Sequence, residues 1–157
     1  MKNVLFVGFK GKNNTSGILA EQLSPQHLLL TNSFAGLRRD IASIRDEYDC
    51  VVMFGVDKTL TSSVRIEKVA SLNGMERASV INLQRLREAL TDGGVPAEIS
   101  DAPTAYLCNE AYWHVLDRFS GKAVFIHVPT RKHVDDGFIE KMRSVLVGST
   151  LSEGTTA

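Results

Sequence analysis

Short apolar runs alternate along the chain with stretches in which apolar residues recur at helical spacing. The runs expected to form strands are 4–9, 27–30, 50–54, 64–70, 95–99 and 123–128. The stretches expected to form helices are 15–23, 33–48, 108–120, 134–147 and a segment from Leu83 to the terminator Gly93-Gly94. This alternation is typical of an α/β fold in which helices cover a mostly parallel sheet.

The remaining segments are expected to be loops. Residues 10–14 and 56–63 are polar, and 71–79 has no clear periodicity. With no internal repeat or linker, residues 1–148 are expected to form one domain, followed by a frayed tail at 149–157. The expected fold class is a single-domain, three-layer α/β/α arrangement around a mostly parallel, mixed sheet.

Composition narrows the function classes. Lys plus Arg and Asp plus Glu both total 18, so no net field attracts nucleic acid or an anionic membrane. No run approaches the roughly 18 apolar residues of a membrane span. Only two cysteines occur, which favours a reducing cytoplasm over a disulfide framework. The cysteines and histidines have no metal-ligand spacing, so neither a metal nor another cofactor is expected.

Two residues carry candidate chemistry. His127 lies near the carboxyl end of an otherwise apolar strand, the edge at which sites assemble in α/β sheets. Cys108 falls in the expected first turn of a helix, where the helix dipole favours a thiolate. The plainer alternatives are a buried histidine with satisfied nitrogens and a cysteine that only packs in the core. Cys50, within a central strand, fits the core role better.

Three motifs in one chain order resemble a known family. The segments Thr104-Ala105-Tyr106-Leu107-Cys108-Asn109 and Phe125-Ile126-His127-Val128-Pro129 resemble the nucleophile and histidine motifs of pyroglutamyl peptidase I, also called pyrrolidone carboxyl peptidase. Upstream, Glu67-Lys68-Val69-Ala70 resembles the acidic motif of that family. The resemblance extends, with gaps, to about Leu146 and implies a phosphorylase/hydrolase-like fold.

The resemblance implies a role for each matching residue. Cys108 would be the nucleophile, His127 its general base and Glu67 the carboxylate that orients the histidine. Arg77 matches an arginine near the family's active site and would aid the oxyanion donors. Phe9 and Asn14 match the start of the family and are further candidates for the substrate site. The resemblance also implies a peptide or small amide substrate and assembly into a homo-oligomer.

The substrate-binding segments depart from the family pattern. The loop Lys10-Gly11-Lys12-Asn13 replaces a Pro-Phe-Gly turn whose phenylalanine helps to enclose the pyroglutamate ring. Val56-Asp57-Lys58-Thr59 replaces a glycine-rich stretch with a lactam-binding glutamine, and Pro103-Thr104 replaces an Ala-Gly pair. These changes affect recognition of a neutral lactam more than the triad chemistry. Lys10 and Lys12, which lie beside a helix N-terminus, favour an anionic group.

Three functions therefore remain open. The first is removal of N-terminal pyroglutamate by a thiol peptidase, and the second is hydrolysis of another small amide or lactam. The third is a non-catalytic descendant that keeps the fold for binding. Retention of all three triad residues argues against the third.

Overall fold

The computed structural model describes residues 3–147, and the expected tail at 149–157 lies outside these residues. A six-stranded sheet forms the centre, with the strand order β2-β1-β3-β8-β4-β7. These strands span His27–Leu30 (β2), Val4–Phe9 (β1), Cys50–Val56 (β3), Ala123–Val128 (β8), Val64–Glu67 (β4) and Ala97–Ser100 (β7). The first four are parallel, β4 is antiparallel to β8, and β7 is parallel to β4.

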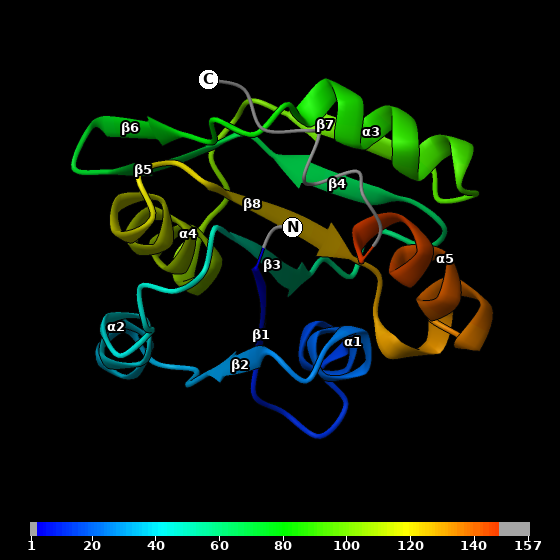
Figure 1. Ribbon diagram of the computed structural model, residues 1–157, viewed down its shortest axis with the longest axis horizontal. Coiled ribbons are helices and arrows are strands. Elements are labelled where there is room, and N and C mark those ends of the chain that lie inside the picture. The colour runs from blue at the N-terminus through cyan, green and yellow to red at the C-terminus, as the bar shows by residue number, and fades with distance from the viewer. Residues whose placement is uncertain (1–2, 148–157) are drawn as a thin grey trace.

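Five α-helices cover the two faces of this sheet. They span Thr15–Leu23 (α1), Phe34–Ala42 (α2), Leu83–Asp92 (α3), Tyr106–Arg118 (α4) and Asp136–Leu146 (α5). Apolar residues of α1, α3 and α5 form one core with the sheet, and those of α2 and α4 form a second core on the opposite face. Figure 1 shows these layers, with α2 and α4 to the left of the sheet and α1 and α5 to its right. The expected α/β fold class is confirmed.

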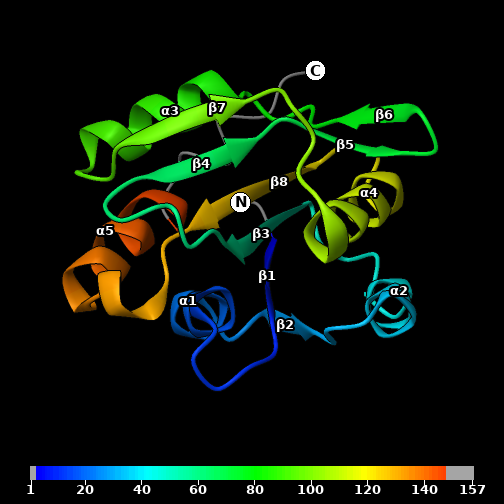
Figure 2. The ribbon, with the colours of Figure 1, turned by 180° about the vertical axis from the view of Figure 1, so that it is seen from behind.

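The segment from residue 64 to 79 differs from the expectation. A single strand was expected at 64–70, but the chain leaves the main sheet at Lys68 and continues as β5 (Val69–Leu72). β5 pairs with β6 (Met75–Ala78) in a hairpin where an irregular stretch was expected. The turn consists of Asn73 and Gly74, which both have positive φ, as a tight hairpin turn requires. The hairpin lies beside α4 in both views (Figures 1 and 2).

Three helices also have different bounds from those expected, and one of them, α4, spans Tyr106–Arg118 rather than 108–120. α2 ends at Ala42 rather than near residue 48. Ser43 is its C-cap, and the Ser43 hydroxyl donates to the carbonyl of Asp40 over 2.6 Å. α5 begins at Asp136, since the carboxylate of Asp135 accepts from the N–H of Phe138 and fixes the N-terminus there. A short 3-10 turn, Arg131–His133, precedes it.

Candidate active site

Strands β4 and β8 bring a carboxylate and an imidazole together. In their antiparallel register Glu67 lies opposite Phe125 and Arg65 lies opposite His127. Side chains two residues apart share a face of a strand, so Glu67 and His127 form a diagonal pair on one face. The distance from His127 Nδ1 to Glu67 Oε2 is 2.8 Å, and the two residues are only 3% and 1% exposed. Since a carboxylate can only accept, the proton is assigned to Nδ1, which leaves Nε2 as the basic nitrogen.

Cys108 reaches the same face from the third residue of α4. A Cβ built on Gly55 would lie 3.0 Å from its Sγ, so the thiol lies directly over Gly55. Gly55 is the partner of His127 in the parallel pairing of β3 with β8. Neighbouring strands lie about 4.8 Å apart, so the thiol and the imidazole are neighbours. The three predicted catalytic residues are therefore brought together near the carboxyl ends of β3 and β8.

A pocket of about 690 Å³ opens over this place, a volume within the range of small-molecule sites. Cys108 and His127 both line it. The other lining residues are Val56, Asp57, Lys58, Arg65, Thr104, Ala105, Tyr106 and Leu107. The wall thus combines the loop after β3 with the segment that leads into α4.

The N-terminus of α4 lies at this pocket and has no side-chain cap. Ala105 is its N-cap residue and supplies no side-chain hydrogen bond, whereas Asn14, Ser33, Asn82 and Asp135 cap the other α-helices. The N–H groups of the first turn have no partner within a helix. In α4 these belong to pocket-lining residues, including Cys108 itself. They can stabilise a negative oxygen beside the thiol.

The first half of α4 is anchored by two polar side chains that follow the cysteine. Asn109 accepts from the N–H of Ser71 over 3.0 Å and donates to the carbonyl of the same residue over 2.6 Å. Tyr112, one turn further, donates from its hydroxyl to the backbone carbonyl of Glu67 over 2.8 Å. The helix that carries Cys108 is therefore bonded to β5 and to the end of β4.

Arg65 links the carboxylates of the site. Its Nε lies 2.7 Å from Glu67 Oε2, and its Nη1 lies 2.8 Å from Asp57 Oδ2. Burial alone would raise the pKa of Asp57, but hydrogen bonds from Thr59 and the contact with Arg65 outweigh it and lower this pKa to about 2. Both carboxylates therefore face a permanent cation. Arg65 was missed as a site residue, although its spacing of two from Glu67 on a strand places both on one face.

The electrostatics of Cys108 differ from the expectation of a helix-stabilised thiolate. Burial is the largest influence and, together with the charges of Glu67 and Asp57, it raises the pKa of the Cys108 thiol from 9.0 to about 11. The resting group is therefore a neutral thiol. A base must remove its proton during any reaction in which the sulfur attacks.

The three other candidate residues lie outside the pocket lining. Arg77 lies on β6, where its guanidinium stacks 3.9 Å from the ring centre of Trp113 and its Nη2 lies 3.4 Å from Asp117. This arrangement holds the hairpin against α4 and offers no support for an oxyanion role. Phe9 is buried in the core beneath α2 and α4. Asn14 caps α1 by accepting from the N–H of Ser16.

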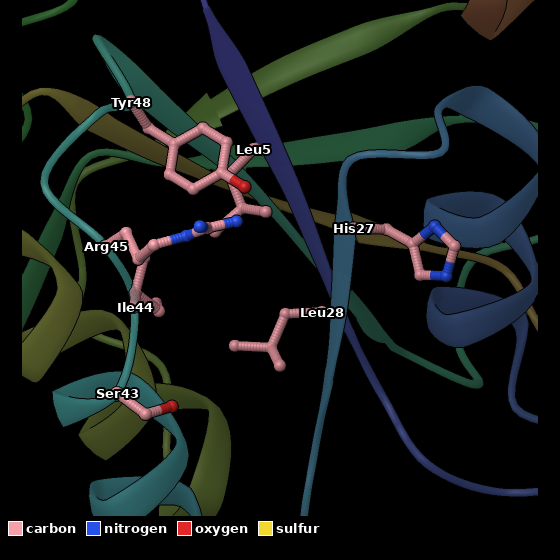
Figure 3. A pocket seen from close by; sticks show the side chains of 7 residues that line it. All are labelled: Leu5, His27, Leu28, Ser43, Ile44, Arg45 and Tyr48. Carbon is pink, nitrogen blue, oxygen red and sulfur yellow. The ribbon is translucent and has the colours of Figure 1, made fainter.

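A second, smaller hollow of about 150 Å³ lies at the β2 edge of the sheet (Figure 3). Its lining residues are Leu5, His27, Leu28, Ser43, Ile44, Arg45 and Tyr48. The ring of His27 points away from the others, and its Nδ1 lies 2.7 Å from the carbonyl of Ser24 (Figure 3). The hydroxyl of Ser43 is directed to the helix carbonyl of Asp40. This hollow therefore lacks a nucleophile paired with a base.

Between residues 3 and 147, no group of three or more His, Cys, Asp or Glu side chains is arranged to hold a metal ion. Within the same range, no helix combines the length and the apolar character needed to cross a bilayer.

The fold and the site geometry together define an α/β protein in which Cys108 and His127 line one pocket and Glu67 is bonded to His127. A sequence model of the family described as pyroglutamyl peptidase matches residues 63–145, just over half of the chain. The chain belongs to this family, as the motifs around Glu67, Cys108 and His127 indicated. A comparison with curated proteins finds no match.

Solved structures of the same family share the fold over nearly the whole chain. Pyrrolidone carboxyl peptidase from Thermococcus litoralis is 21% identical, with a TM-score of 0.76 over 98% of this chain and 94% of that one. Pyroglutamyl peptidase I from Bacillus amyloliquefaciens is 17% identical, with a TM-score of 0.75 over 99% and 98%. Pyrrolidone carboxyl peptidase from Thermus thermophilus is 15% identical, with a TM-score of 0.75 over 96% and 99%. The α/β architecture is thus shared at low sequence identity.

Proposed function

We propose that the protein is a thiol peptidase that hydrolyses an N-terminal pyroglutamyl amide, with Cys108 as nucleophile, His127 as general base and Glu67 as the group that orients the histidine. The convergence of these three side chains at one pocket is the observation that carries the proposal. Family membership supports the reaction class.

The proposed reaction begins from the neutral thiol. His127 takes the proton of Cys108 at Nε2 while the sulfur attacks the amide carbonyl, and Glu67 stabilises the positive ring through Nδ1. The carbonyl oxygen becomes an oxyanion, which the free N–H groups at the start of α4 stabilise. His127 then returns the proton to the leaving amine, which leaves a thioester. Water, deprotonated by the same imidazole, hydrolyses the thioester and restores the thiol.

A second candidate, hydrolysis of another small amide, is favoured by the charges of the pocket wall. Asp57, Lys58 and Arg65 all line it, and the first and last form an ion pair 2.8 Å apart. A neutral lactam gains little from such a wall, whereas an acyl group with its own charge or several hydrogen-bond groups gains more. The substrate thus remains a peptide or small amide, and the lactam is its first candidate.

Turnover of pyroglutamyl-7-amido-4-methylcoumarin tests the proposal directly. We expect the wild type and Cys50→Ala to release the fluorophore and Cys108→Ala to release none. Cys50 is the matched control because it is the other cysteine and is buried within β3. Amides of proline, pyroglutamate and short acyl groups, assayed in parallel, separate the two candidate substrates. Absence of turnover with every amide, together with unchanged folding, would exclude the catalytic proposal.

The two cysteines are both free of disulfides, which suits a thiol nucleophile in a reducing compartment. We accordingly propose the cytoplasm as the site of action. Size-exclusion chromatography with light scattering tests the homo-oligomer that family resemblance implies.

A further inference from the structure

The guanidinium of Arg65 contacts three titratable groups of the candidate site at once. Nε lies 2.7 Å from Glu67 Oε2, Nη1 lies 2.8 Å from Asp57 Oδ2, and Nη2 lies 3.3 Å from His127 Nδ1. Glu67 Oε2 therefore accepts from both Arg65 and His127. Nδ1 carries the proton that Glu67 accepts, so Nη2 does not donate to it. The bonds from Nε and Nη1 to the two carboxylates hold the planar guanidinium and, with it, the position of the Glu67 carboxylate.

The charges around the Cys108–His127 pair come from two neighbouring segments. The loop after β3 contributes Asp57 and Lys58, and β4 contributes Arg65 and Glu67. In the described part of α4, the titratable residue that bonds to these charged residues is Tyr112, whose hydroxyl donates to the backbone carbonyl of Glu67. Burial raises the pKa of Tyr112, so its hydroxyl stays neutral. The two carboxylates disfavour the Cys108 thiolate. Arg65 is the cation that is bonded to both carboxylates.

We propose that Arg65 is a positioning residue that fixes the Glu67 carboxylate for His127 and, with Asp57, sets the pH range in which Cys108 and His127 exchange a proton. This inference rests on the proposed cysteine hydrolase function. Nothing in the nucleophile, histidine or acidic motifs assigns a role to this arginine, and it acts through Glu67 rather than on the reacting atoms.

The sign of the effect follows from simple electrostatics. Removal of the Arg65 charge leaves two carboxylates uncompensated, so the Cys108 thiol holds its proton more tightly. The pH profile of Cys108 ionisation then moves to higher pH. Removal of the Asp57 charge has the opposite sign, because the site loses a negative charge while Arg65 remains. Two single substitutions thus move one profile in opposite directions.

The test measures the rate of Cys108 alkylation by iodoacetamide against pH, with the labelled cysteine located by peptide mass mapping. This readout needs no turnover. We expect Arg65→Gln to raise the midpoint of the profile by about one pH unit and Asp57→Asn to lower it by a similar amount. Arg65→Lys keeps the charge, so its midpoint stays near that of the wild type. Arg45→Gln, which removes an exposed arginine paired only with Glu47 in the described structure, is the matched control and leaves the profile unchanged.

Turnover of the coumarin amide tests whether Arg65 positions the Glu67 carboxylate for His127. Arg65→Lys offers a point charge instead of a planar fork, so we expect kcat to fall about 10-fold with KM nearly constant. A midpoint for Arg65→Gln that coincides with those of the wild type and Arg45→Gln overturns the proposal. If Arg65→Gln does not fold, an unshifted Asp57→Asn profile overturns it equally. Absence of wild-type turnover sinks the proposed peptidase function, while the alkylation profiles still decide the role of Arg65.

Discussion

Glu67 and His127 meet diagonally across strands β4 and β8, with 2.8 Å between Oε2 and Nδ1. The contact depends on an antiparallel strand in an otherwise mostly parallel sheet. Because β4 runs against β8, the carboxyl end of β4 lies level with Phe125, one pleat before the histidine. A long carboxylate at this diagonal position reaches the ring nitrogen, and both side chains stay buried.

Glu67→Gln tests the value of this contact. The amide keeps the shape of the side chain but offers no charge to a protonated ring, and its NH₂ group can select the wrong tautomer. We expect kcat/KM for the coumarin amide to fall by about 100-fold or more. Glu98→Gln, the same change at an exposed position of β7, is the control and keeps full activity. Equal activity of the two variants would remove Glu67 from the proposed triad.

Gly55→Ala tests the position of the thiol. The new Cβ would lie 2.6 Å from the Phe125 ring and 3.0 Å from Cys108 Sγ, so at least one of these must move. Overpacking of this kind costs about 1–3 kcal/mol. We expect a lower free energy of unfolding and a drop of about 10-fold or more in kcat, since a small displacement of a nucleophile is costly. Both quantities are measured by urea titration and the coumarin assay.

Gly137→Ala is the matched control for this variant. Gly137 lies in the first turn of α5, and an added Cβ would meet Asp135 at an ordinary 3.4 Å. Alanine is also a better helix former than glycine, so this change is neutral or slightly stabilising. A Gly55→Ala protein as stable and active as Gly137→Ala would contradict the placement of Cys108 over β3.

The parts of the fold that periodicity encodes were predicted well. Strands β1, β2 and β8 have the expected bounds, because each is a mainly apolar run flanked by polar residues or proline. The segment 64–70 hides a change of sheet, since Val69 and Ala70 follow Lys68 with no glycine or proline to mark the end of the first strand. The hairpin after it did have a local signal, the Asn73-Gly74 pair, which favours a tight turn.

The candidate site was likewise predicted only in part. The motifs brought Cys108, His127 and Glu67 into consideration. In the structure Cys108 and His127 line one pocket, and Glu67 is bonded to His127. The ion pair between Arg65 and Asp57 joins two segments through the β4–β8 register, which no local pattern encodes. The high pKa of Cys108 likewise arises from burial and from distant carboxylates, whereas the sequence displays only its helix position.

Asn109 provides a test of how α4 is held. Its amide forms two hydrogen bonds with the backbone of Ser71, and Asn109→Ala leaves that N–H and carbonyl without these partners. Loss of such bonds at a half-buried site costs about 1–3 kcal/mol. We expect lower stability and a decrease of kcat, because the hairpin no longer fixes the first turn of α4.

Urea titration and the coumarin assay measure the two effects. Gln84→Ala removes an exposed amide from α3 and serves as control. A stable Asn109→Ala protein with wild-type kcat would show that the anchor does not position Cys108.

The raised pKa of Cys108 predicts how stability depends on pH. Between pH 9 and about 11 the folded protein keeps a thiol proton that the unfolded chain releases. The folded state therefore binds more protons in this window, and the free energy of unfolding falls as pH rises through it. Cys108→Ala lacks this contribution, so we expect the wild type to lose about 1–3 kcal/mol more than the variant between pH 8 and 11.

The comparison of the two proteins isolates this thiol. Tyr112, whose pKa is also raised by burial, weakens both proteins alike in the alkaline range. Urea titrations under a reductant at intervals of pH give the difference directly. A difference that stays constant from pH 8 to 11 would mean that Cys108 ionises equally in the folded and unfolded chains, contrary to a thiol buried beside Glu67 and Asp57.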